Sequence, residues 1–380
     1  MGHAVRWDGA TGIIPRMDRL VKACAAAILS PFCMFAGIRP SFYLESCVWN
    51  ATEILVISPT SGSFKVVETI KGNPQPGAML ELNGLRPTSG ATGKLRELIP
   101  GIDNVFDQEH WFQDIPPIGD GDRVMVFLRR PGALPEWSPN NASIKTDGWQ
   151  PANNMGDLQT SAIWIQDGSL YGFFQTMNPG PTHLVRMQES EVELRKQIQA
   201  VMQLRDAMDR AVVTSDPVER SRQLTALFRS GNVFARASSL QKLERGGEAG
   251  TAALLDLLTD RSLLGWHQDI LGALVEQHVS DDRFGKFLSE ETDYWSTACR
   301  TLRPGWWNDM TRWPEVEIPR NHYTRSYALL RSIYELNLTA ALPVVKEFDA
   351  VWAACPPLEP GEKTNQVKDE LKLVLGTDGH

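Results

Sequence analysis

The chain has 380 residues, of which 42% are hydrophobic and 22% are charged, so its composition excludes an intrinsically disordered protein and predicts about two folded domains. The formal net charge of -8 at pH 7 argues against a nucleic-acid partner, because affinity for phosphate backbones depends on Lys and Arg displacing counterions. The hydrophobic period changes near residue 186, from alternating or short apolar runs to a repeat of three or four positions. We therefore expect an α+β multidomain protein divided at residues 1–40, 41–185 and 186–380.

The first segment has the layout of a secretory signal. Arg16, Arg19 and Lys22 precede an apolar run over residues 23–38, which ends in small residues. The run is shorter than the roughly 20 apolar residues that a membrane-spanning helix needs. We expect a secreted or periplasmic protein without a membrane span once the signal is removed. An uncleaved membrane anchor and a cytoplasmic protein with an apolar N-terminal element are the alternatives.

Removal of such a signal would leave three cysteines, Cys47, Cys299 and Cys355. An odd number cannot pair completely within one chain. In an exported protein, Cys299 and Cys355 are the natural candidates for a disulfide because both lie in the helical half. The alternative is that all three are small buried thiols. Neither Cys-x-x-Cys nor His-x-x-x-His occurs in the chain, and the spacing predicts no metal site and no cofactor.

Short apolar segments separated by turn residues predict antiparallel strands. Residues 53–57 and 63–70 form one expected hairpin, because the intervening residues are rich in Ser, Pro and Gly. A second expected hairpin joins 161–165 to 169–174 through Asp-Gly, with single strands at 78–82 and 122–128 between the two hairpins. Five or six such strands predict a small closed β-barrel, because closure removes unpaired strand edges.

Part of this region resembles a known module. Residues 47–52 with the apolar strand after them, residues 64–72, a Pro-containing loop with Gly77, and residues 121–128 are similar to the oligonucleotide-binding-like (OB-like) barrel of netrin-type modules. Tissue inhibitors of metalloproteinases use the same module, and similar segments occur in uncharacterised exported bacterial proteins. The resemblance covers roughly residues 43–175. It implies that Cys47, as a mature N-terminal residue, would chelate a partner's zinc, although residues 44–46 make a poor cleavage site.

A long insertion over residues 84–120 contributes His110, Trp111 and Asp114, and a second irregular region contributes Trp137 and Trp149. Loops of this length in compact domains are usually functional or disordered. These five residues form a candidate pocket, suited to a ligand, a weak divalent-ion site or acid/base chemistry. Alternatively, the aromatic residues cap the barrel while the charges face water.

In the second half of the chain, apolar residues at every third or fourth position predict a series of amphipathic helices. The first covers residues 189–213, and Asp216 then caps a new helix that has Pro217 at its first position. Further helices are expected at 233–243, 249–258, 266–279, 282–302, 322–338, 342–354 and 364–375. Residues 216–280 resemble two HEAT-type helical repeats, in which each pair buries its apolar face against the next. An unrelated helical bundle is the alternative.

A Pro-flanked segment, 303–319, interrupts the helical pattern. Its candidate partner contacts are Trp306, Trp307, Trp313, Arg303 and Arg312, because tryptophan and arginine dominate binding hot spots. In that case, replacing Trp306 and Trp307 by Ala leaves thermal stability nearly unchanged. The alternative is that the segment packs into a groove between helices, and its removal then costs stability.

Taken together, these patterns favour an exported binding or scaffold protein without catalytic activity, which engages another protein or an envelope component. A hydrolase-type enzyme is the first alternative, with His110 and Asp114, or His183 and Glu189, as its candidates. No Gly-x-Ser-x-Gly, phosphate-loop, dinucleotide or His-Glu-x-x-His motif accompanies them. A protease-inhibitor-like module is the second alternative.

Overall fold

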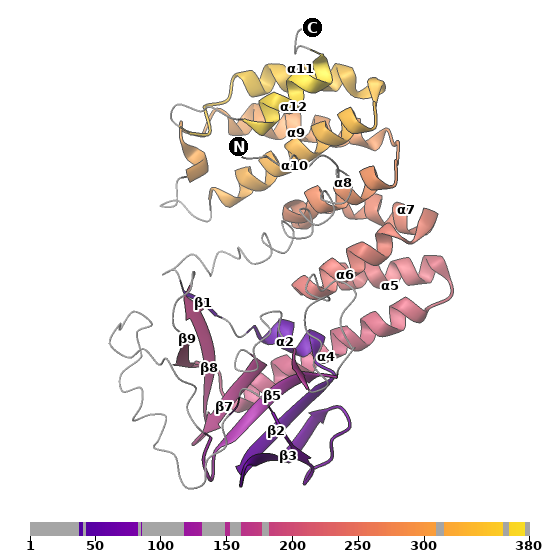
Figure 1. Cartoon of the computed structure of the whole chain (residues 1–380). Helices are drawn as coiled ribbons and strands as arrows, with labels where there is room; N and C mark the ends of the chain where they lie inside the picture. Colours follow the sequence, from indigo (N-terminus) through magenta and orange to yellow (C-terminus); the bar gives the residue numbers. More distant parts are fainter. Residues whose placement is uncertain are drawn as a thin grey trace, which may run out of the picture. The chain divides into compact units, whose positions relative to one another are not determined.

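The computed structural model describes residues 38–40, 43–82, 85, 118–130, 149–152, 161–176, 182–308, 315–359 and 365–376. An N-terminal antiparallel sheet is followed by a series of helices (Figure 1). The described residues beyond 186 contain no strand, so the change of hydrophobic period coincides with the change from strands to helices. No helix among the described residues has the length and hydropathy needed to cross a membrane.

Nine strands form one sheet. They pair in the order β1-β8-β7-β5-β2-β3-β4, with β6 beside β5 and β9 beside β8, and every pairing is antiparallel. The strands are β1 (Ile38–Pro40), β2 (Glu53–Thr60), β3 (Ser63–Lys71), β4 (Met79–Leu80), β5 (Arg123–Arg129), β6 (Gln150–Pro151), β7 (Ala162–Gln166), β8 (Ser169–Thr176) and β9 (Thr182–Arg186).

Both predicted hairpins are confirmed. β2 and β3 are joined at Gly62, and β7 and β8 are joined through Asp167 and Gly168, all three in positive-φ conformations. Asp and Gly tolerate this backbone conformation, which tight hairpin turns require. The turn chemistry of the sequence was therefore sufficient to place these connections.

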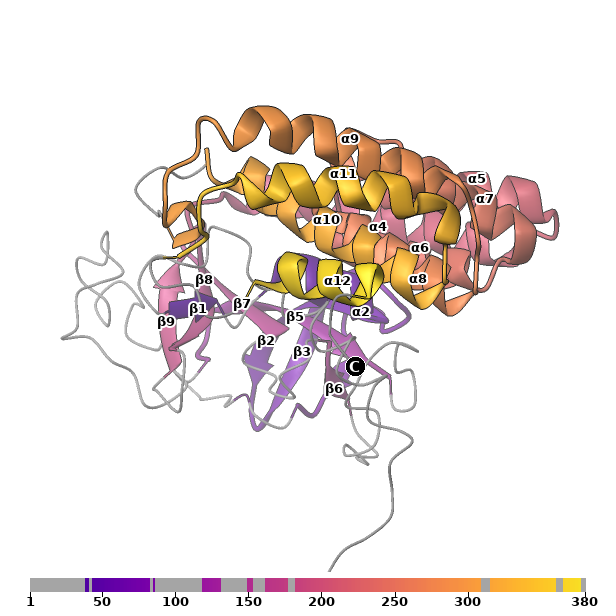
Figure 2. The same ribbon diagram turned by 90° about the horizontal axis from the view of Figure 1, so that it is seen from above.

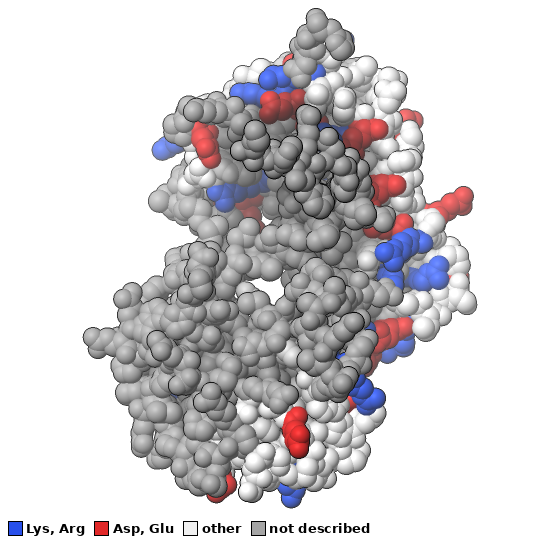
Figure 3. All heavy atoms as spheres, in the orientation of Figure 1, with Lys and Arg blue, Asp and Glu red and all other residues white. Residues whose placement is uncertain are grey.

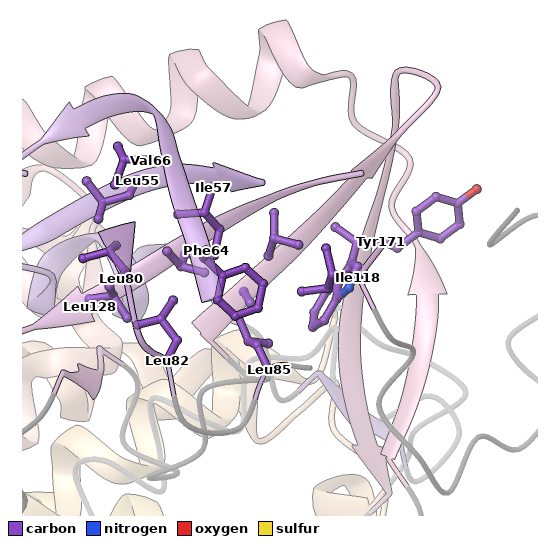
Figure 4. Close-up of a cluster of buried hydrophobic side chains, with 14 residues drawn as sticks. Leu55, Ile57, Phe64, Val66, Leu80, Leu82, Leu85, Ile118, Leu128 and Tyr171 are labelled. Atoms are coloured by element: carbon purple, nitrogen blue, oxygen red, sulfur yellow. The ribbon is translucent and has the colours of Figure 1, made fainter. Parts of the chain in front are cut away.

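The sheet is buried on both faces. Fourteen side chains gather on one face in the core cluster of Figure 4, to which β5 contributes Val124, Val126 and Leu128. Side chains alternate along a strand, so Met125 and Phe127 point to the opposite face, where they are also fully buried. Helix α2 (Leu44–Asn50) packs against β5.

The sequence predicted a closed barrel, whereas the described strands form an open path that ends at β1 and β4. The expectation assumed that closure alone could protect the edges of short strands. Here β4 pairs over only two residues and β1 over three, so the edges are short. A sheet with short edges can stay open, and apolar packing on both faces stabilises it.

The chain divides into two compact units. The sheet unit comprises residues 1–207 with 232–235, and the helical unit comprises residues 208–231 with 236–380. Helix α4 (Glu191–Val213) contributes its first part to the sheet unit. Arg195 on this helix bonds both carboxylate oxygens of Glu68 on β3, each at 2.8 Å, and Arg123 on β5 bonds Glu191 at 3.1 Å. These ion pairs explain why the start of α4 belongs with the sheet.

In the helical unit, several helices pack against the next helix but one in the chain. Helices α8, α10 and α12 pack one after another, as do α9 with α11 and α5 with α7 (Figures 1 and 2). Immediate neighbours also pack, namely α7 with α8, α9 with α10, and α11 with α12. The bounds are α5 (Pro217–Arg229), α6 (Val233–Glu244), α7 (Gly247–Leu257), η3 (Arg261–Trp266), α8 (His267–Glu276), α9 (Arg283–Ala298), η4 (Trp306–Asn308), α10 (Glu317–Glu335), η6 (Thr339–Ala341), α11 (Leu342–Ala353) and α12 (Gln366–Leu375).

Candidate functional site: a disulfide-tied tryptophan segment

The chain leaving α9 is tied covalently to the chain leaving α11. Cys299, at the end of α9, forms a disulfide with Cys355, which follows α11, and their Cα atoms lie 4.6 Å apart. The predicted bridge is confirmed. Cys47 is the free cysteine among the described residues, and it is fully buried.

Backbone hydrogen bonds extend this connection beyond the disulfide. The N–H of Gly305 donates to the carbonyl of Pro357 at 3.0 Å, and the N–H of Trp307 donates to the carbonyl of Leu358 at 3.3 Å. Gly305 has φ +81°, a conformation that favours glycine. The tryptophan segment, residues 303–308, is therefore held in place at several points along the residues that follow α11.

Trp306 lies inside the helical unit. Its side chain is 5% exposed, and its ring centre lies 6.0 Å from that of Trp295 on α9 and 5.6 Å from that of Trp307. Trp295 in turn packs edge-on against Trp352 of α11 at 4.7 Å. For Trp306 the structure favours the second alternative from the sequence, in which the segment packs between helices, because an indole this deeply buried offers almost no surface to a partner.

Trp307 is half-buried, in contrast to Trp306. Its ring packs against Tyr323 of α10 at 4.9 Å, and the guanidinium of Arg320 lies 5.3 Å from its ring centre. Such a cation over an indole face is a favourable electrostatic contact. Arg303, which precedes Trp307 in the chain, and Ile318, which follows it, are both exposed. Two other predicted contacts, Arg312 and Trp313, lie outside the described residues.

A buried charged cluster lies between α9 and α10. The carboxylate of Glu291 accepts hydrogen bonds from Arg325 at 2.7 Å, from Ser326 at 3.1 Å and from Nδ1 of His322 at 3.0 Å. Arg325 also donates to Glu290 at 3.3 Å. A fully buried carboxylate is stable when several donors compensate for its lost hydration, and these contacts meet that requirement.

This charged cluster is joined to the aromatic core. Nε1 of Trp295 donates to the hydroxyl of Ser326 at 3.0 Å, and Ser326 donates to Glu291. The ring of Tyr294 stacks on His322 at 3.5 Å between ring centres. Burial raises the pKa of Tyr294 to about 12, and the nearby charge of Glu291 adds to this increase. The tyrosine is therefore neutral at physiological pH.

His267 at the start of α8 is a second buried imidazole. Its Nε2 lies 3.1 Å from the carbonyl oxygen of Asp260 and donates to it in the corresponding tautomer. Burial, aided by the positive charge of Arg325, lowers the pKa of His267 to about 4. The ring is therefore neutral near pH 7.

The pair of His322 and Glu291 has the geometry of an imidazole oriented by a carboxylate, which is an element of general-base sites. Nδ1 of His322 is bonded to Glu291, and the other donors to Glu291 come from Arg325 and Ser326. The contacts favour a structural role for this cluster. Sequence reasoning missed it, although Glu291 lies on the apolar stripe of α9 between Leu288 and Trp295, and a carboxylate in that position was the available signal.

The candidate pocket near the sheet is located only in part. His110, Trp111, Asp114 and Trp137 lie outside the described residues. Trp149 is half-buried and packs against the core cluster. This contact favours the alternative in which an aromatic residue covers the sheet core.

The alternative catalytic pair lies only partly within the described residues. Glu189 is exposed, and the side chain of His183 lies outside the described part of the structure. Within the described residues, no three or more His, Cys, Asp or Glu side chains are grouped to hold a metal ion.

Cys47 lies within α2 and is fully buried. Its backbone N–H donates to the carbonyl of Tyr43 at 2.9 Å within α2, and burial raises the pKa of its thiol to about 12. The thiol is therefore neutral near pH 7, and zinc chelation by a mature N-terminal Cys47 stays a prediction.

Comparisons with protein-family models, with curated proteins and with solved structures found no match to this chain.

Proposed function

We propose that this protein is an exported binding or scaffold protein without catalytic activity, whose helical unit engages another protein or an envelope component. The observation that carries the proposal is the alternating packing of α8, α10 and α12 on one side and α9 and α11 on the other. Helices stacked in this manner create an extended surface on which side chains from successive helices lie side by side. Such surfaces are suited to binding other macromolecules.

The finer architecture that we propose for the helical unit is a HEAT-like stack. In such a stack each helix contacts its partner within a pair and its counterpart in the next pair, which is the pattern of α9 to α12. For the sheet unit, the relationship to netrin-type modules stays a prediction from residues 43–175.

The disulfide supports export, because disulfides persist mainly in oxidising compartments. It agrees with the secretory signal expected at residues 16–38. In the described part of the face shown in Figure 3, Lys and Arg alternate with Asp and Glu, which favours a mixed-charge partner over a polyanion.

Within the helical unit, we propose that Trp307 and Arg303 contact the partner. Trp307 is held by the ring of Tyr323 and by the guanidinium of Arg320 over its own ring, so it loses little conformational freedom on binding. This preorganisation is typical of aromatic hot spots.

Site-specific photo-cross-linking tests this proposal. A photoreactive amino acid replaces Trp307 in one variant and Tyr334, which is 45% exposed at the far end of α10, in a control variant. In the native envelope fraction we expect a discrete cross-linked product from position 307 and a much weaker one from position 334. Equal labelling at both positions, or recovery of the protein from the cytoplasm with an uncleaved N-terminus, would contradict the proposal.

A further inference from the structure

Strand β5 begins and ends with an arginine, and both arginines lie on the same face of the sheet. Arg123 is its first residue and Arg129 its last, and both alternate with the core-facing residues of the strand. At the rise of an extended strand, the two Cα atoms are about 20 Å apart. Their environments can therefore be compared as two separate sites on one surface of the sheet.

The exposed arginine has a carboxylate partner, and the buried one has none among the described residues. The side chain of Arg123 is 39% exposed and donates to Glu191 at 3.1 Å. Arg129 is 3% exposed, and its Nε donates to the carbonyl of Pro151 at 3.0 Å. The Nη1 of Arg129 is buried and has no hydrogen-bond partner among the residues that the structure describes.

Glu53 on the neighbouring strand β2 is already used on the other face of the sheet. Glu53 is the cross-strand neighbour of Leu128, so its side chain shares the face of Leu128 and not that of Arg129. Its two oxygens accept from Arg130 Nε at 2.7 Å and from the backbone N–H of Asn73 at 2.8 Å. Glu53 therefore does not neutralise Arg129.

The face of Arg129 carries a second cation. Lys71 is in register with Ile54, which is in register with Phe127, so these residues and Arg129 share one face of the sheet. Nζ of Lys71 donates to the carbonyl of Ala51 at 2.7 Å. The carboxylate of Glu68 on this face bonds Arg195, each oxygen at 2.8 Å, so it is engaged by another arginine.

A buried guanidinium that lacks a countercharge is costly for the folded protein, and a buried donor without a partner requires a physical explanation. Burial lowers the pKa of Arg129, in agreement with a charge placed in an unfavourable environment. A bound anion would remove both costs, because it supplies the negative charge and the missing acceptor.

We propose that Arg129 forms an anion-binding site in the sheet unit, which takes the carboxylate or phosphate group of a small ligand. The planar guanidinium matches two oxygens of either group, and Nη1 is the donor still available. This site is independent of the function proposed for the helical unit.

Isothermal titration calorimetry on the full chain tests the site. Sodium phosphate and sodium succinate are titrated separately at constant ionic strength in chloride buffer, and the anion that binds identifies the class of ligand. We expect Arg129→Met to weaken binding by about tenfold or more, because the charge-assisted hydrogen bonds are lost. The matched control, Arg123→Met, is expected to stay within about twofold of the unmodified protein, because Arg123 lies at the other end of the strand.

The proposal is overturned if neither anion binds the unmodified protein, since water alone would then satisfy Nη1. It is also overturned if Arg129→Met binds as tightly as the unmodified protein. Circular dichroism establishes whether Arg129→Met folds, and if it does not, Arg129→Lys decides the matter. Lys keeps the charge but loses the planar fork, so we expect weakening of about threefold or more, and unchanged affinity rejects the site.

Discussion

Arg325 donates a hydrogen bond to the carboxylate of Glu291 at 2.7 Å, and the two side chains are 2% and 0% exposed. They belong to different helices and are 34 residues apart in the sequence. The pair connects α9 to α10 at the centre of the helical unit, where water cannot replace either partner.

Removal of one member of this pair is expected to be severe. Glu291→Ala leaves Arg325 buried without its main partner and should lower the free energy of unfolding by roughly 3–5 kcal/mol. Chemical denaturation measures this change. The control is Glu290→Ala, whose carboxylate is partly exposed and should cost less than about 1 kcal/mol. Similar losses for both variants would show that burial of Glu291 has no special importance.

The disulfide should contribute substantially to the stability of the helical unit. It links residues 56 positions apart, and a chain-entropy estimate for a loop of this length is about 4 kcal/mol. Measurements on a Cys47→Ala background isolate the bridge, because no other cysteine is then present among the described residues. We expect the thermal midpoint to fall on reduction, and an unchanged midpoint would contradict this contribution.

Trp306 and Trp307 should respond differently to truncation. The sequence hypothesis of a surface segment predicted little loss of stability from replacing either residue. Because Trp306 is buried against Trp295, Trp306→Ala should instead cost about 3–5 kcal/mol. Trp307→Ala should cost distinctly less, since its ring is half-buried. Denaturation curves that rank the two variants in the opposite order would disprove this assignment.

His267 should make the helical unit sensitive to acid. Its pKa is about 4 in the folded protein and near 6.5 when unfolded, so the unfolded chain binds more protons between these values. The stability that depends on the neutral His267 ring is therefore fully present above pH 6.5. As the pH falls toward 4, the free energy of unfolding decreases by about 3 kcal/mol. His267→Gln should flatten the stability profile in this window. A profile that keeps the same slope in the His267→Gln variant would contradict this prediction.

Gly72 lies where no side chain fits. It has φ +102°, and a Cβ atom there would collide with the carboxylate of Glu53. Gly77 has a similar φ of +95° but open space around it. Gly72→Ala should therefore destabilise the sheet unit clearly more than Gly77→Ala, whose cost of about 1–2 kcal/mol comes from the left-handed backbone alone. Equal midpoints in urea would show that Glu53 moves aside freely.

Local patterns in the sequence were sufficient for the elements of the fold. The helix that begins at Pro217 is capped by Asp216, whose side chain accepts from the N–H of Val218. The hairpin at Asp167 and Gly168 follows from the backbone conformation that those residues tolerate. Such features depend on residues that are neighbours in the chain, so they can be predicted without knowledge of the fold.

The candidate site was predicted less completely. The pairing of Cys299 with Cys355 was one of two alternatives that the sequence left open, and the structure shows it. The buried location of Trp306 did not, because an aromatic residue in a Pro-rich segment is compatible with a surface as well as with a core. Trp306 packs against Trp295 of α9, which in turn packs against Trp352 of α11.

By itself, the sequence determined where strands give way to helices, which turns join the hairpins, and which cysteines can pair. Only the tertiary structure decided that the sheet is open, that Glu291 meets Arg325 and His322, and that Arg129 is buried without a carboxylate among the described residues. The physical reason is that periodicity and turn chemistry act between neighbours in the chain. Burial and charge pairing, in contrast, depend on contacts between residues that are far apart in sequence.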